Sequence, residues 1–149
     1  MYHTLLIPLD GSRHAEKALS IAAQLGRDSS AVLYLLHVKE LPDDIGLLVG
    51  SSGQPFTEER RLELARHADD QARAAFDGAR RAVDLSGLDV HEVIQEGRPA
   101  DTILRQATEV GAEAIVMGSR GMSELKGMLM GSVSHKVMHA AGCTVITVT

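Results

Sequence analysis

Short apolar runs alternate with longer amphipathic stretches along the whole chain, and this alternation is the strongest constraint on the fold. Three of the runs are almost continuously apolar, which is typical of strands buried on both faces of a parallel sheet. A fourth run alternates more and indicates an outer strand, and a fifth is rich in β-branched residues. The five predicted strands are His3–Leu9, Ala31–Val38, Leu88–Gln95, Glu113–Gly118 and Cys143–Val148.

Helical patterns separate these strands. The first helix has Ser12 as its expected N-cap and Gly26 as its expected stop. The second begins near Thr57, the third has Pro99 at its first position, and the fourth opens at Gly131. Strict alternation of strand and helix predicts an α/β protein, with a single doubly wound, open sheet of five parallel strands and helices on both faces.

Composition excludes several classes of protein. The 149 residues are 44% apolar, which suits one packed domain over residues 1–149 and is too apolar for a disordered chain. The net charge of -5 argues against a nucleic-acid partner. No apolar run approaches the ~20 residues that span a membrane, so no membrane partner is expected. With one cysteine and no signal-peptide pattern, the predicted location is cytoplasmic.

One segment, from Lys39 to Phe56, is too long for an ordinary connection. Loops of this length in compact domains are usually functional lids or mobile segments, and both interpretations stay open here.

The residues that follow three of the predicted strands point to a ligand site. In an open α/β sheet, ligands bind beyond the carboxyl ends of the strands, where the strand order switches. The order 3-2-1-4-5 would bring Asp10, Val38 and Gly118 to that point. The alternative role for Asp10 is to cap the first helix together with Ser12, and His37 is interpreted only as the end of its strand.

The stretch GSRGMSELKGMLMGSVSHKV, residues 118–137, contains the glycines that bear on this site. Glycine lets backbone N–H groups converge on an anion, and the start of a helix adds free N–H groups. Ser132 and Ser134 could add hydroxyl donors. Neither the P-loop pattern nor G-x-G-x-x-G is present. On glycine spacing alone, a structural connection is favoured over a phosphate site.

Other constellations predict no chemistry. His135 and His139 share a helix face and could bind a metal, but no third ligand is evident, so a solvated face is the preferred interpretation. No nucleophile–base arrangement and no carboxylate pair can be found, so no catalytic residues are predicted and at most slow hydrolysis of a nucleotide is expected.

The chain resembles the universal stress protein family over essentially its whole length. The family signature G-x-x-G-x(9)-G-[ST] is matched by Gly118, Gly121, Gly131 and Ser132. The segments LLIPLDGSRHAEKALSIAAQL, LLHV, EGRPADTIL, IVMGSRG and GSVSHKV are also similar to family segments. The resemblance implies a doubly wound fold and membership in the branch whose glycine motif accompanies ATP binding.

Carried over by position, the resemblance implies an ATP site, with Mg²⁺ bound through the phosphates. Asp10 is expected near the ribose, and Val38 is expected to meet adenine through its backbone. The other expected contacts are Pro8 and Leu9 at the nucleoside, Met117 and Gly118 at the base and ribose, Gly121, Gly131, Ser132, Val133 and Ser134 at the phosphates, and also Arg120.

The predicted function is therefore an ATP-binding regulatory protein of the stress-response type, read by a partner protein that the sequence does not identify. The alternatives are a nucleotide hydrolase or transferase using the same pocket, and a ligand-free interaction module with purely structural glycines. The last strand, Cys143 to Thr149, has no proline or lysine to protect its edge. This edge and the resemblance both predict a symmetric homodimer through that strand.

Overall fold

A computed structural model describes residues 1–40, 57–122 and 130–149 of the chain. Most of the predicted lid or mobile segment, Lys39 to Phe56, therefore lies outside the described residues. No helix in the described part is long and apolar enough to cross a membrane.

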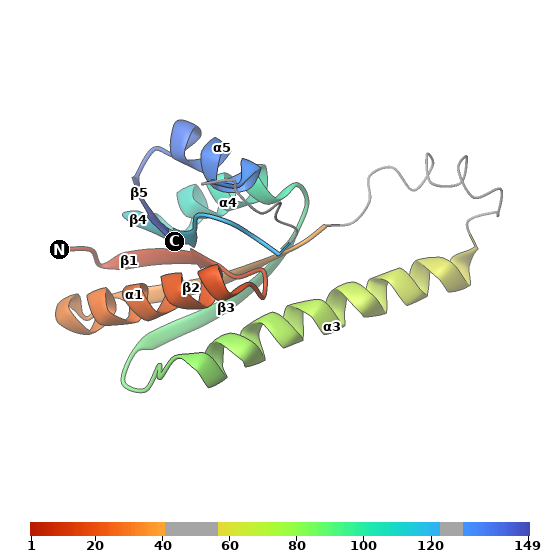
Figure 1. Cartoon of the computed structure of the whole chain (residues 1–149), viewed down its shortest axis with the longest axis horizontal. Helices are drawn as coiled ribbons and strands as arrows, with labels where there is room; N and C mark the ends of the chain where they lie inside the picture. Colours follow the sequence, from red (N-terminus) through yellow and green to blue (C-terminus); the bar gives the residue numbers. More distant parts are fainter. Residues whose placement is uncertain (41–56, 123–129) are drawn as a thin grey trace.

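The strands form one sheet in the order β3-β2-β1-β4-β5, and every pairing is parallel (Figure 1). Strict alternation with helices confirms the predicted doubly wound α/β fold. The strands are β1 Thr4–Pro8, β2 Val32–Lys39, β3 Asp89–Glu96, β4 Ala114–Gly118 and β5 Thr144–Val148.

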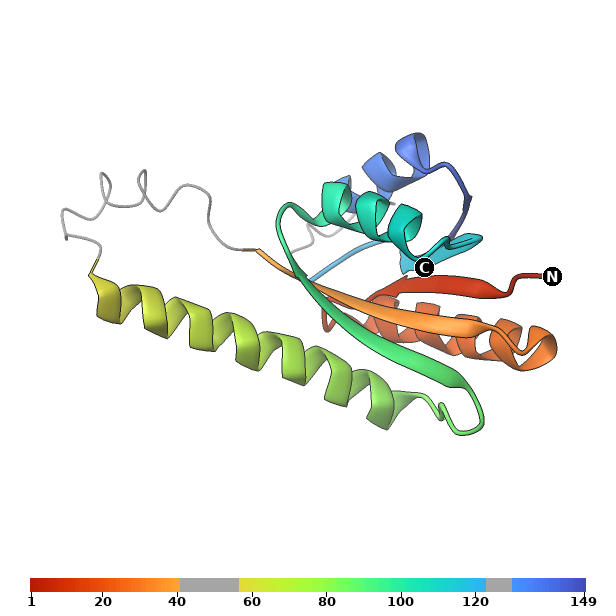
Figure 2. The ribbon, with the colours of Figure 1, turned by 180° about the vertical axis from the view of Figure 1, so that it is seen from behind.

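Helices cover both faces of the sheet. Figures 1 and 2 show α1 and α3 on one side and α4 and α5 on the other. All four helices begin where the sequence predicted, with Ser12 as the N-cap of α1, Thr57 as the N-cap of α3, Pro99 at the start of α4 and Gly131 as the N-cap of α5. The helices are α1 Arg13–Ser29, α3 Glu58–Ala82, α4 Pro99–Glu109 and α5 Ser132–Ala140.

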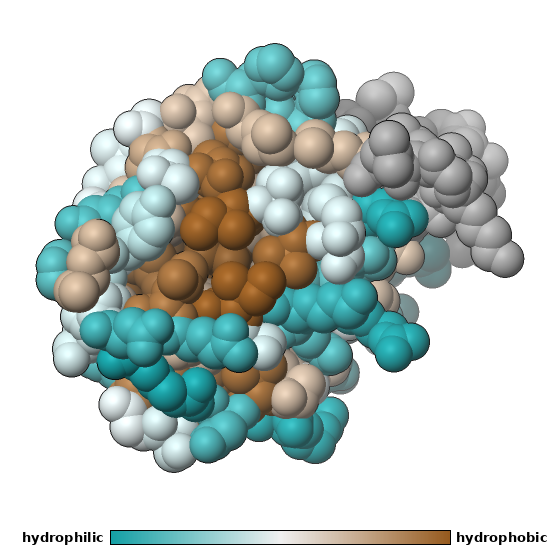
Figure 3. Space-filling model, turned by 60° about the vertical axis from the view of Figure 1, so that its left-hand side comes forward, coloured by the Kyte–Doolittle hydropathy of each residue, from teal (hydrophilic) through white to brown (hydrophobic). Residues whose placement is uncertain are grey.

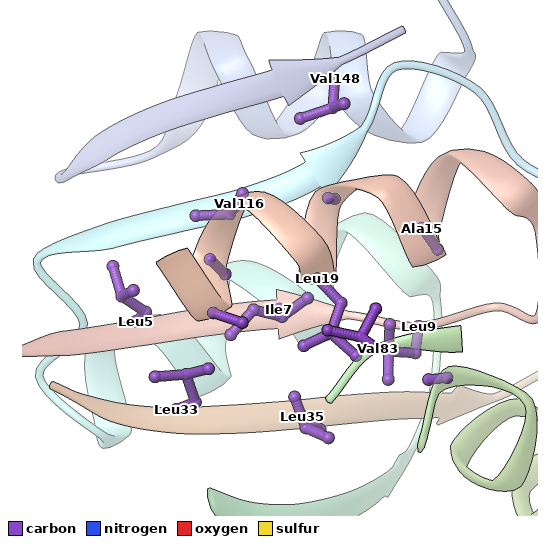
Figure 4. Packing of buried hydrophobic residues seen from close by; sticks show 14 of the residues in the cluster. Leu5, Ile7, Leu9, Ala15, Leu19, Leu33, Leu35, Val83, Val116 and Val148 are labelled. Carbon is purple, nitrogen blue, oxygen red and sulfur yellow. The ribbon is translucent and has the colours of Figure 1, made fainter. Parts of the chain in front are cut away.

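Each face of the sheet has its own core, because alternate residues of the central strands point to opposite faces. Figure 4 shows Leu5, Ile7 and Leu35 in one cluster, which also includes Leu19 of α1. The opposite cluster packs against α4 and α5 and includes Leu6, Leu36, Ile115 and Met117. Burial on both faces explains why these strands are almost continuously apolar in sequence.

The first helix does not stop at Gly26, contrary to the prediction. It continues to Ser29 and ends at Ser30, which has a left-handed backbone with φ 52°. Gly26 is buried, and a Cβ there would lie 2.7 Å from Leu33 Cδ1. The glycine is present because helix and strand approach closely, which is a packing constraint that local sequence does not reveal.

Helix α3 is 25 residues long, and its amino-terminal part extends beyond the sheet (Figures 1 and 2). Two ion pairs link it to β2 and β3. Lys39 of β2 pairs with Asp69, and Arg80 pairs with Glu92 of β3 at 2.6 Å. Phe76 is buried between these two pairs, so the helix is positioned over the β2 side of the sheet.

Candidate functional site

The strands on either side of the switch point separate toward their carboxyl ends. Strand β1 pairs with β4 only at Leu5 and Leu6, whereas its pairing with β2 continues to Pro8. Beyond this short pairing the two segments remain close, since a Cβ on Gly121 would lie 2.8 Å from Asp10 Oδ2. The crevice expected at the switch point therefore has Asp10 on one side and the first part of the glycine stretch on the other.

Asp10 turns one carboxylate oxygen into this crevice. Its Oδ1 accepts a hydrogen bond of 2.9 Å from the Ser12 amide, and its Oδ2 faces Gly121. The N-cap of α1 is Ser12, whose Oγ accepts a hydrogen bond from the Ala15 amide at 3.2 Å. Ser12, and not Asp10, provides the side-chain cap of α1, and Asp10 is exposed.

Gly118 marks a close approach between β4 and the first turn of α1. A Cβ there would lie 2.7 Å from His14 Cβ and 2.9 Å from the His14 carbonyl carbon. These contacts are too short for any side chain. Gly118 is thus required by packing, whatever else it contacts.

Val38 presents unpaired backbone groups at the β2 side of the crevice. The last bond of the β1–β2 ladder runs from the Leu9 amide to Leu36 O at 2.8 Å. In a parallel ladder alternate residues face the same neighbour, so Val38 turns its N–H and C=O toward the β1 side, as Leu36 does. Among the described residues neither group has a backbone partner. A donor and an acceptor therefore stand side by side at the crevice.

Helix α5 begins without a side-chain cap. Its first backbone bond runs from the His135 amide to Gly131 O at 3.0 Å. The amides of Ser132, Val133 and Ser134 precede that bond, and none of them donates to a backbone acceptor within the described ranges. The Gly131 amide is used, because it donates to Ser119 O at 2.7 Å. The donors available to an anion are the amides of residues 132–134.

Ser134 links the first turn of α5 to the backbone just after β4. Its buried hydroxyl lies 2.7 Å from Ser119 O and 3.0 Å from Gly131 O. Since a hydroxyl has one proton, these two carbonyl oxygens share it. The Ser134 hydroxyl is therefore committed within the protein, and an anion at this position would meet its amide. The hydroxyl of Ser132 is exposed.

The remaining predicted contacts surround the crevice. Pro8 and Arg120 are half-buried next to it, at the end of β1 and just after β4. Leu9 and Met117 are buried, and their side chains belong to the two core clusters. These two residues can meet a ligand mainly through their backbones.

A further residue at the site, His37, received no role in the sequence analysis. Its ring is buried on β2, and its Nδ1 lies 2.8 Å from Leu9 O. A single histidine at a strand end carries no recognisable spacing, so only the three-dimensional contact reveals it.

Two other groups with metal-binding or reactive side chains lie among the described residues. The rings of His135 and His139 lie 4.5 Å apart and are exposed. Within the described residues no three His, Cys, Asp or Glu side chains gather as metal ligands. Burial raises the pKa of the Cys143 thiol, which lowers its reactivity at neutral pH.

The fold and the crevice define a doubly wound α/β protein with a candidate ligand site at the switch in strand order. The sequence model of the universal stress protein family matches residues 1–149, and the chain belongs to this family.

Individual relatives agree with this assignment. The chain is similar to universal stress protein YxiE of Bacillus subtilis, with 35% identity over 151 residues and 99% of each chain covered. It is similar to the structure of MJ0577 of Methanocaldococcus jannaschii, with a TM-score of 0.79, 28% identity and coverage of 99% and 96% of the two chains. It also resembles an Archaeoglobus fulgidus universal stress protein solved in complex with dAMP (TM-score 0.63, 26% identity, coverage 99% and 98%).

Proposed function

We propose that this protein binds ATP in the crevice between β1 and β4, and that a partner protein reads the bound state in a cytoplasmic stress response. One observation carries the proposal: Asp10, after β1, lies against Gly121, after β4, at the switch in strand order. The unpaired Val38 backbone and the uncapped start of α5 support it. The related protein crystallised with dAMP supports an adenine nucleotide as the ligand.

The Val38 backbone suits the edge of adenine. Adenine offers an acceptor at N1 beside a donor at its N6 amine, which complements the N–H and C=O of Val38. Guanine has the opposite arrangement, with a donor at N1 and an acceptor at O6. The geometry therefore supports adenine over guanine.

The start of α5 suits the phosphates. Three amides and the positive end of the helix dipole favour an anion there. No cluster of metal-ligating side chains exists in the described residues, so Mg²⁺ would be held through the phosphate oxygens and water, as Mg²⁺ often is in nucleotide sites. We assign the exposed carboxylate of Asp10 to the ribose, as the family resemblance implies.

We further propose a homodimer through β5. This strand is an edge of the sheet, and its Val145 and Ile146 remain partly exposed although each packs on a core cluster. Figure 3, which brings the β5 side of the molecule forward, shows a hollowed apolar area there. Light scattering at micromolar protein tests this proposal, and a monomer mass would contradict it.

Calorimetric titration with ATP and Mg²⁺ tests the proposed function. We expect saturable binding by the wild type and a loss of about tenfold in Asp10→Ala, since a charged hydrogen-bond acceptor is removed. Asp28→Ala, at an exposed aspartate near the far end of α1, is the matched control and should bind normally.

Absence of binding at millimolar ATP, in protein that carries no nucleotide after purification, would overturn the proposal. Sustained ATP turnover that Asp10→Ala abolishes would instead identify an enzyme.

A further inference from the structure

We propose that His37 is a positioning residue that sets the adenine preference of the site by keeping the Val38 amide unpaired. This inference rests on the proposed function. His37 itself touches no part of the expected ligand, and it acts through the neighbouring carbonyl group of Leu9.

The tautomer of His37 follows from its partner. His37 is 8% exposed, and its Nδ1 lies 2.8 Å from Leu9 O. A carbonyl oxygen only accepts, so Nδ1 carries the hydrogen and donates it. The ring also meets Phe76 of α3 edge-on, with the two centroids 6.3 Å apart, which holds the imidazole in place from the other layer.

This hydrogen bond replaces a bond of the sheet. After the Leu9 amide has bonded to Leu36 O, the next bond of a parallel ladder would run from the Val38 amide to Leu9 O. That bond is absent from the described part of the chain, where Leu9 O accepts from His37 instead. The β1–β2 ladder therefore ends one step early.

Because the ladder ends early, the Val38 N–H and C=O remain able to form hydrogen bonds with a base. Leu9 O accepts from His37 and not from the Val38 amide, so that amide is left to donate to adenine N1 beside a carbonyl that accepts from N6. Without the imidazole, Leu9 O can recruit the Val38 amide and remove the donor to N1. A guanine nucleotide has no acceptor at N1, so it loses little by this change, and the preference for ATP over GTP should fall.

Two amide substitutions of His37 separate this role from general packing. The side-chain nitrogen of asparagine can take the place of Nδ1, whereas that of glutamine takes the place of Nε2. We expect His37→Asn to keep the wild-type ratio of GTP to ATP dissociation constants within about threefold. His37→Gln should lower that ratio by about tenfold, as expected for one lost hydrogen bond.

Phe76→Leu is the control for packing, because it loosens the contact behind the ring but leaves the imidazole present. It should lower the free energy of unfolding without changing the nucleotide preference. His37→Leu removes the imidazole donor altogether and should lower the preference for ATP over GTP. If this variant does not fold, the comparison of His37→Asn with His37→Gln tests the role of His37.

Amide hydrogen exchange provides a measurement without nucleotide. The Val38 amide should exchange rapidly in the wild type and in His37→Asn, and slowly in His37→Gln, where it bonds to Leu9 O. Failure of the wild type to bind ATP would overturn the proposed function. The exchange rates would still test whether His37 keeps the Val38 amide from bonding to Leu9 O. Equal ATP-to-GTP preference in wild type and His37→Gln, together with equal Val38 exchange, would overturn the role of His37 and leave nucleotide binding intact.

Discussion

The helices α1 and α5 both begin at the carboxyl edge of the sheet, beside the same crevice, yet they begin in different ways. Helix α1 has a serine N-cap whose hydroxyl accepts from the Ala15 amide, and the Asp10 carboxylate accepts from the Ser12 amide. Helix α5 starts at Gly131, which has no side chain to accept from its first amides. The start of α1 is therefore capped by side chains of its own segment, and the start of α5 is not.

The two helices also differ in how firmly they are packed. Helix α1 buries six residues, whereas α5 buries only Ser134 and Val137. An uncapped start costs stability, and here the Ser134 hydroxyl compensates by binding Ser119 O. Helix α1 is thus the more firmly packed of the two, while the first amides of α5 have no side-chain acceptor, as the proposed phosphate site requires. Four substitutions test this contrast, in order of decreasing effect.

The largest effect is expected at the point where α1 is packed most tightly. Gly118→Ala would place a Cβ against the backbone of His14, and we expect a loss of about 3 kcal/mol in the free energy of unfolding. Urea denaturation measures it. Gly142→Ala is the control, because nothing lies within 4 Å of a Cβ at that position. Equal midpoints for the two variants would show that the start of α1 can shift.

The second substitution adds a side-chain cap to the start of α5. Gly131→Asp would supply a cap like that of α1, so the free energy of unfolding should rise by about 0.3 kcal/mol. The new carboxylate would repel the phosphates, and ATP affinity should fall by about 30-fold, or about 2 kcal/mol. Gly131→Asn caps without charge and should lose less affinity. Unchanged ATP binding in the aspartate variant would place the phosphates elsewhere.

The third substitution removes the side-chain cap from the start of α1. Ser12→Ala removes the cap and should lower the free energy of unfolding by about 1 kcal/mol. ATP binding should stay within about twofold of wild type, because the Ser12 amide that binds Asp10 remains. Thermal unfolding and calorimetry measure the two effects, with exposed Ser20→Ala as the control. A large loss of affinity would mean that both helix starts serve the ligand.

The smallest effect concerns the outer side of α5. Lys136 binds Asp101 of α4 at 2.6 Å, and this hydrogen bond holds the pKa of the Asp101 carboxyl below its usual value. A lowered carboxyl pKa stabilises the fold above the unfolded-state value and loses that stabilisation as the pH falls through the folded-state value. Lys136→Met should therefore be slightly less stable at pH 7, and the difference should vanish in acid. A difference that persists at pH 2 would exclude this ion pair as its cause.

Much of the fold could be predicted from the sequence, because its signals are local or periodic. Continuous apolar runs identified strands buried on both faces, and Ser12, Thr57 and Pro99 marked helix starts through rules that span only a few residues. The strand order 3-2-1-4-5 was a hypothesis that the apolar pattern alone did not determine, and the structure confirms it. Gly26 misled the prediction, because its reason lies in a contact with Leu33 on the next strand and not in its own neighbourhood.

The candidate site could be predicted only in part. Family resemblance and strand ends brought Asp10, Val38 and Gly121 into one proposal, and the structure places Asp10 beside Gly121. The contacts of His37 and Ser134 could not be predicted, because each side chain binds a backbone carbonyl oxygen, and every residue of the chain has one. Which backbone groups stay unpaired depends on where the ladder ends, and that is a property of the assembled sheet.

The position of β1 has a consequence for the chain during its synthesis. This strand is made first, but it lies in the middle of the sheet, between β2 and the much later β4. At ordinary rates of translation, on the order of ten seconds pass between the synthesis of β1 and that of β4. During that interval one edge of an apolar strand has no partner and can pair with another nascent chain. Expression at low temperature or with chaperones should therefore improve the yield more than stabilising substitutions in the finished fold.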